Sequence, residues 1–105
     1  MTITHTWFGH ATQMLDVNGT KLLIDPFFSG NPAATLTADK VKADYILVSH
    51  GHGDHVGDAL AIAKRTGATV IANFEIINWW IVERVNSYLL GEFLQIRYVF
   101  GVSCF

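Results

Sequence analysis

Three histidines and an aspartate crowd into one short stretch of the chain. The stretch reads Ser49-His50-Gly51-His52-Gly53-Asp54-His55, and the whole sequence contains only five histidines. Neutral imidazole and carboxylate are ligands that suit Zn, Fe, Mn and Ni. Two alternatives are a polar turn that contains histidines by chance and a structural zinc site, but structural sites favour cysteine-rich shells. Because the chain has one cysteine, the residue types favour a catalytic metal site.

The spacing of these residues suggests how cations would be held. His50 and His52 are two positions apart, so in extended backbone their side chains point the same way and can bind one ion. Asp54 and His55 follow at the start of a helical pattern and face a second position nearby. The spacing therefore predicts two adjacent ions, which two-metal hydrolases keep about 3.5–4 Å apart.

The elements around this cluster follow from hydrophobic patterns. Residues Tyr45–Val48 form a continuous apolar run, which predicts a strand buried on both faces of a sheet. Val56–Thr66 has the apolar face of a helix that ends at Gly67, and Thr69–Ala72 predicts another buried strand. A strand, a helix and a strand in this order predict a right-handed crossover between parallel strands. The metal-binding loop would then lie at the carboxyl edge of the sheet, where open α/β folds bind ligands.

The first part of the chain has the pattern of an antiparallel meander. Ile3–Phe8 alternates polar and apolar residues, and Ala11–Val17 and Lys21–Ile24 flank Asn18-Gly19, the strongest short hairpin signal. Residues 28–42 are rich in small and polar residues, and they predict a loop with at most one short helical turn.

These residues resemble the metallo-β-lactamase superfamily, and in particular its small bacterial and archaeal metal-dependent hydrolases related to ascorbate-phosphate lactonase. His50-Gly51-His52-Gly53-Asp54-His55 matches the superfamily signature HxHxDH. Supporting matches are Trp7-Phe8-Gly9-His10-Ala11-Thr12, Leu23-Ile24-Asp25-Pro26-Phe27, Ala43 to His50, and Ala72-Asn73-Phe74-Glu75. The resemblance implies an α/β fold, namely the N-terminal half of a four-layer αβ/βα sandwich, with a mixed sheet and helices on one face.

Two further residues are expected to lie around the ligands. Asp25 closes the third predicted strand, where the superfamily commonly places an aspartate near the metal loop, and a carboxylate there would orient an imidazole ligand. The alternative is an ordinary strand-ending aspartate that caps a turn. The resemblance also places His10 close to the site, although the superfamily pattern does not use this residue as a ligand. His5, on the first predicted strand, is expected to be structural.

The resemblance implies a hydrolase that uses two divalent cations, zinc in the first place, with manganese or iron as alternatives. The ligands would be His50, His52, Asp54 and His55, and Asp54 would also act in catalysis by orienting the attacking water. The expected substrate is a small molecule with a lactone, ester, amide or phosphodiester bond. Two alternatives are a non-catalytic metal-binding fragment and a relative of the di-iron oxidoreductases, which typically place an acidic residue where His52 stands.

The recognisable motifs end near Trp79. We therefore assign residues 1–77 to half of a metallo-β-lactamase-like domain and interpret residues 78–105 as a hydrophobic tail, produced by truncation or a frameshift of a longer enzyme. The second half of such an enzyme supplies further histidines and a bridging aspartate, whereas no histidine follows His55 here. The candidates for late ligands are Glu75, Glu83, Glu92 and Cys104, none of which lies in a recognisable motif.

Composition limits the remaining function classes. A chain of 105 residues forms one domain at most, and its net charge of −2 argues against a nucleic-acid partner. The single cysteine and the absence of a signal-peptide pattern in residues 1–10 predict a reducing, cytoplasmic location. Charged residues interrupt the apolar tail before a membrane span accumulates. The oligomeric state is not readable from these features.

Overall fold

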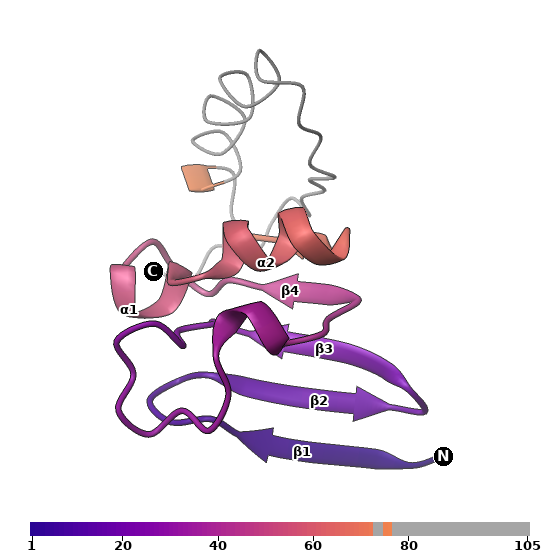
Figure 1. Cartoon of the computed structure of the whole chain (residues 1–105). Coiled ribbons are helices and arrows are strands. Elements are labelled where there is room, and N and C mark those ends of the chain that lie inside the picture. Colours follow the sequence, from indigo (N-terminus) through magenta and orange to yellow (C-terminus); the bar gives the residue numbers. More distant parts are fainter. Residues whose placement is uncertain (73–74, 77–105) are drawn as a thin grey trace.

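The computed structural model describes residues 1–72 and 75–76, and within them five strands form one mixed sheet (Figure 1). The strands follow one another across the sheet in chain order: β1 Ile3–Trp7, β2 Gln13–Val17, β3 Thr20–Ile24, β4 Tyr45–Leu47 and β5 Thr69–Ile71. The first three are antiparallel, and β3, β4 and β5 are parallel. The predicted meander and the predicted parallel pair are therefore confirmed.

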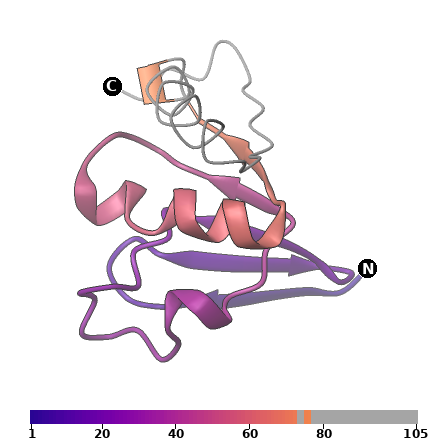
Figure 2. The same ribbon diagram turned by 45° about the horizontal axis from the view of Figure 1, so that its top comes forward.

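The helices of this described part lie on one face of the sheet. They are the 3-10 turn η1 Ala38–Lys40 and the helices α1 Gly53–Val56 and α2 Ala59–Thr66. Figures 1 and 2 show α2 and η1 on the same side of the strands. The Arg65 guanidinium joins them, because it donates hydrogen bonds to the carbonyl oxygens of Ala38 and Val41. No helix in this described part combines the length and hydrophobicity that a membrane span requires.

A row of apolar side chains crosses the sheet beneath α2. The row consists of neighbours in register on four successive strands, Met14, Leu23, Ile46 and Val70. All four are buried, and Ile62 of α2 is buried with them. Since burial of one such side chain contributes about 1.5–3 kcal/mol, this row helps to hold the sheet and the helix together.

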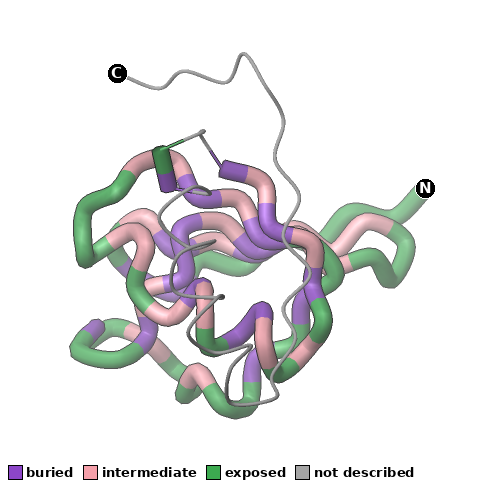
Figure 3. The backbone as a smooth tube through the Cα atoms, turned by 90° about the horizontal axis from the view of Figure 1, so that it is seen from above, coloured by how far each residue is buried: buried purple, intermediate pink, exposed green. Residues whose placement is uncertain are grey.

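The opposite face of the sheet is less covered. All five residues of β1 are exposed (Figure 3), and Trp7 remains 65% exposed. Tyr45 of β4 is 42% exposed as well. The prediction that the strand beginning at Tyr45 is buried on both faces is therefore wrong for this residue, because the described helices cover only the other face.

Glycine conformations explain where the local elements turn and stop. Asn18 and Gly19 both have positive φ, 53° and 91°, as the predicted two-residue hairpin requires. Gly67 ends α2 in the left-handed conformation, as predicted, and its N–H bonds to the carbonyl oxygen of Ala63.

The predicted single helix over residues 56–66 is instead two helices. Gly57, with φ 42°, separates α1 from α2. A Cβ atom at this position would lie 2.5 Å from the carbonyl oxygen of Pro26. The helix is interrupted because the chain packs against the backbone after β3 at this point.

Candidate metal centre

The predicted metal loop leaves the carboxyl end of β4 and enters α1. Residue His52 is the N-cap of α1, with an extended backbone, and Asp54 and His55 lie in its first turn. The ring of His50 has its centroid 4.7 Å from that of His52 and 4.0 Å from that of His55. The three imidazoles of the loop therefore lie close together after the carboxyl end of β4.

The carboxylate of Asp25 is the buried anchor of this loop. Asp25 follows β3, is only 3% exposed and has a positive φ of 45°. Its Oδ1 accepts a hydrogen bond from the N–H of Ser49 at 2.7 Å. Its Oδ2 accepts from the hydroxyl of Ser49 at 2.5 Å and is 2.9 Å from Nδ1 of His55. Three donors thus satisfy a carboxylate that would otherwise be costly to bury.

These hydrogen bonds determine the tautomers of two histidines. An ionised carboxylate only accepts, so Nδ1 of His55 must carry the hydrogen that Asp25 receives. The hydroxyl of Ser49 gives its single hydrogen to Asp25, so the 2.9 Å contact with Nδ1 of His50 is a bond that His50 donates. In their neutral form both histidines then keep a lone pair on Nε2, which is the state that binds a cation. The residues present therefore fit a metal.

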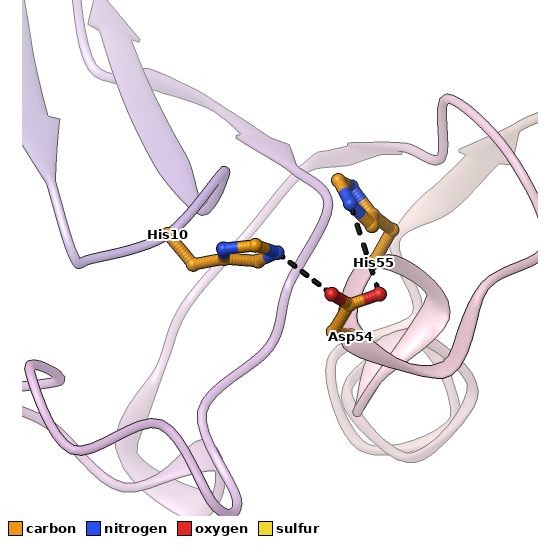
Figure 4. A group of neighbouring side chains, drawn as sticks. All are labelled: His10, Asp54 and His55. Carbon is orange, nitrogen blue, oxygen red and sulfur yellow. Dashed lines mark hydrogen bonds and ion pairs between the residues drawn. The ribbon is translucent and has the colours of Figure 1, made fainter.

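A second contact joins the loop to the bend between β1 and β2. Nε2 of His10 lies 2.9 Å from Oδ2 of Asp54, and Nε2 of His55 lies 3.8 Å from Oδ1 of the same carboxylate (Figure 4). One donor atom from each of these three residues lies within 4.8 Å of the others. The same holds for a group made of Asp25, His50 and His55. The two groups share His55, so two clusters of possible ligands lie side by side.

The surroundings of Asp54 favour its ionised form. Desolvation by neighbouring atoms raises the pKa of this carboxyl, but the hydrogen bond from His10 and the charge interaction with His55 outweigh it. The pKa of Asp54 therefore lies below its ordinary value. At neutral pH the side chain is a carboxylate that is ready to bind a cation.

The structure brings most of the predicted site residues together. His50, Asp54 and His55 converge with Asp25 and His10, whereas His52 is exposed and belongs to neither three-residue group of the described part. Among the late ligands suggested by the sequence, Glu75 is exposed and also lies outside these groups. The other three, Glu83, Glu92 and Cys104, lie outside the described residues, as does the predicted tail at 78–105.

Sequence reasoning assigned no role to two hydroxyl residues that shape the site. Ser49 links Asp25 to His50, as described above. Thr12 is fully buried, and its hydroxyl donates to the carbonyl oxygen of Asp25 at 2.7 Å and accepts from the N–H of Phe27 at 3.0 Å. Thr12 thereby stabilises the backbone turn that holds Asp25. The sequence feature that could have identified them is that both residues lie inside the recognised motifs.

Comparison with known proteins agrees with this geometry. Residues 5–100 match the sequence profile described as the metallo-beta-lactamase superfamily. A UPF0173 metal-dependent hydrolase of Heliobacterium modesticaldum is 64% identical over 74 residues, which are 70% of this chain and 31% of that protein. A relative from Methanopyrus kandleri with the same description is 55% identical over 95 residues, which are 88% of this chain and 41% of that protein.

A solved structure is similar as well. It is Igni18, described as a metallo hydrolase from the archaeon Ignicoccus hospitalis, with 32% identity and a TM-score of 0.68. The similarity covers 92% of this chain and 39% of Igni18. The chain thus spans well under half the length of the proteins it matches. The matched residues of the superfamily profile continue beyond residue 77, and the domain boundary predicted there stays a prediction.

Proposed function

The chain belongs to the metallo-beta-lactamase superfamily, and from this membership we propose that residues 1–72 form the metal-binding part of a hydrolase. The proposed ligands of two divalent cations are His50, His52, Asp54 and His55. Zinc is the proposed metal, with manganese and iron as alternatives, since imidazole and carboxylate ligands suit all three.

The observation that carries this proposal is the hydrogen-bond chain that starts at Asp25. It engages Nδ1 of His55 directly and Nδ1 of His50 through Ser49. Imidazoles that bind a metal almost always donate their other ring N–H to a carboxylate, a carbonyl or water, which orients the ring and makes the ligand more basic.

The chemistry of the proposed reaction is hydrolysis. Bound divalent cations would supply Lewis acidity, which makes water available as a nucleophile near neutral pH and polarises the bond under attack. Asp54 would bind a cation and orient the attacking water. It would be a poor proton shuttle, because the charge of a bound cation would keep its carboxyl acidic. The proposed substrates are small molecules with a lactone, ester, amide or phosphodiester bond.

Metal binding without turnover is a second candidate. The chain spans 31% and 41% of the two curated relatives described above, and no histidine follows His55 within its 105 residues. The resemblance to the superfamily implies further ligands from later in the sequence. These residues alone would then bind cations with fewer ligands than a complete site has.

Composition supports two further parts of the proposal. The net charge of −2 favours a small-molecule substrate over nucleic acid, since binding to phosphate backbones needs a basic surface. The single cysteine favours a reducing, cytoplasmic setting.

The test combines metal analysis with a turnover assay on the full 105-residue chain. We expect the purified protein to retain zinc or manganese and to hydrolyse generic phosphodiester or lactone substrates, and we expect His52→Ala to abolish turnover. His5→Ala is the matched control, because His5 is exposed on β1 and bonds to Gln13 away from the loop. Metal retention without turnover would select the second candidate, and bound iron with visible absorbance would indicate redox chemistry. A chain that retains no cation would overturn the proposal.

A further inference from the structure

We propose that His10 is itself a metal ligand, and that it joins Asp54 and His55 at the second cation position. This inference rests on the proposed function, because it needs a cation at that position. The inference goes beyond the proposed function by adding a ligand from outside the loop. The superfamily signature contributes only Asp54 and His55 from this part of the chain, whereas the fold brings an imidazole from the β1–β2 bend to the same place (Figure 4).

The donor set has the composition of a catalytic metal position. His10 offers Nε2, which lies 2.9 Å from Asp54 Oδ2. The hydrogen that Nε2 donates to this carboxylate would have to be replaced by the cation, with the hydrogen of the neutral ring then on Nδ1. His55 is bound to Asp25 through Nδ1, so its Nε2 is the free donor, 3.8 Å from the other oxygen of Asp54. Three protein ligands with one open position are the pattern of catalytic zinc sites. His10 and Asp54 are about half exposed, 45% and 49%, so their side chains can adjust around an ion.

The backbone of the β1–β2 bend holds His10 toward α1. His10 has a φ of 54°, a conformation that costs a residue with a side chain roughly 1–2 kcal/mol. The indole N–H of Trp7 donates to the carbonyl oxygen of His10 at 2.8 Å and stabilises this conformation. Gly9 precedes it with a φ of 100°, and a Cβ there would lie 2.6 Å from that of Ala33. The bend is therefore kept in one strained conformation.

Packing does not explain that strain. The His10 side chain is 45% exposed and is not part of the buried apolar core. Its ring lies beside those of His55 and Phe27, with centroids 5.1 and 6.0 Å away. Strained backbone that presents an exposed polar side chain is typical of functional sites. Only two histidines of the sequence lie outside the loop, His5 and His10. His5 bonds to Gln13 on the neighbouring strand, so His10 is the one left as a candidate ligand.

The alternative role for His10 is to position Asp54 by the hydrogen bond alone. Substitution by glutamine separates the two roles. The amide of the His10→Gln variant would keep a side-chain N–H for the carboxylate but would lack the imidazole nitrogen that binds a cation strongly. Removal of a positioning partner typically weakens metal affinity about 10–100-fold, so affinity of an alanine variant alone does not distinguish the roles.

The experiment is a Co²⁺ titration of the full chain, followed by visible absorbance and by the hyperfine-shifted imidazole N–H signals in the proton NMR spectrum. We expect the wild type to bind two equivalents. We expect His10→Ala and His10→Gln both to lose one shifted imidazole signal and to bind one equivalent at least ~10-fold more weakly. His5→Ala is the control and should match the wild type. Circular dichroism should show that all variants stay folded, because both histidines are exposed.

Other outcomes separate this inference from the proposed function. If His10→Gln binds Co²⁺ like the wild type, or if no shifted signal is lost, His10 only positions Asp54 and the inference is wrong while the metal site stands. If the wild type binds a single equivalent that His10→Ala leaves unchanged, the inference is also wrong. If the wild type binds no Co²⁺ at all, the proposed function itself fails.

Discussion

The carboxylate of Asp25 and the imidazole of His55 are 30 residues apart in the sequence and share a 2.9 Å hydrogen bond. Asp25 follows β3 of the antiparallel meander, and His55 lies in the short helix after β4. The bond therefore joins the two parts of the sheet at the edge where the metal ligands gather. It also determines which nitrogen of His55 is free for a cation.

Replacing Asp25 tests this relationship. We expect Asp25→Ala to weaken metal affinity about 10–100-fold, because His55 and Ser49 lose the acceptor that orients them. The change should also lower the free energy of unfolding by about 2–5 kcal/mol, since it leaves part-buried donors without partners. Metal content after gel filtration measures the effect on metal affinity, and urea unfolding measures the effect on stability. Ser49→Ala, which removes one of the donors, should have a smaller effect on stability. An Asp25→Ala chain with unchanged metal content would refute the orienting role.

Two glycines beside the metal ligands should respond oppositely to alanine. At Gly57 a Cβ would meet the Pro26 carbonyl oxygen at 2.5 Å and the Cα of Phe27 at 2.9 Å. Gly57→Ala should therefore destabilise the fold by about 2–4 kcal/mol. At Gly53, the first residue of α1, the added Cβ meets no atom within 4 Å, so Gly53→Ala should be neutral or stabilise by up to about 1 kcal/mol. Equal urea midpoints for the two variants would contradict this account.

Asp58 should hold the loop after β3 in place. Its carboxylate accepts hydrogen bonds from the N–H groups of Phe28 and Ser29, at 2.9 and 2.8 Å, and from the Ser29 hydroxyl at 2.8 Å. Asp58→Ala should cost about 2–3 kcal/mol, because bonds to a charged acceptor are stronger than average. We also expect faster amide exchange at both residues and faster proteolysis of the loop. Ser29→Ala loses only the hydroxyl contact and should cost about 1 kcal/mol. A loop that exchanges at the wild-type rate in Asp58→Ala would rule out this role.

The hairpin should contribute stability that depends on pH. The hydrogen bond from Lys21, followed by the backbone N–H of Gly19, lowers the pKa of Asp16. Because the folded pKa lies below the unfolded value of about 3.9, the stabilisation is present above that value and is lost as pH falls through the lowered folded pKa. Urea unfolding should therefore show wild type more stable than Asp16→Asn near pH 6 and equal to it at about pH 2. The difference should shrink in high salt, since both side chains are partly exposed. A gap between wild type and variant that is independent of pH would exclude this explanation.

Local patterns in the sequence were sufficient for most of the fold. Alternation of polar and apolar residues predicted β1, Asn18-Gly19 predicted the hairpin of β2 and β3, and Gly67 predicted the end of α2. These predictions held because each depends on neighbours along the chain, where side-chain periodicity and backbone preference act directly. The interruption at Gly57 was missed, because its cause is contact with Pro26, which is distant in sequence.

For the candidate site too, some features could be predicted from local sequence and others could not. The sequence by itself determined that imidazoles and a carboxylate cluster after a central strand, because their types and spacing lie within one loop. Only the tertiary structure decided that Asp25 bonds to His55, that Ser49 joins Asp25 to His50, and that His10 bonds to Asp54. Hydrogen bonds between distant residues depend on how strands pair and where a bend points its side chain. These geometries arise from packing of the whole sheet and leave no periodic signal in the chain.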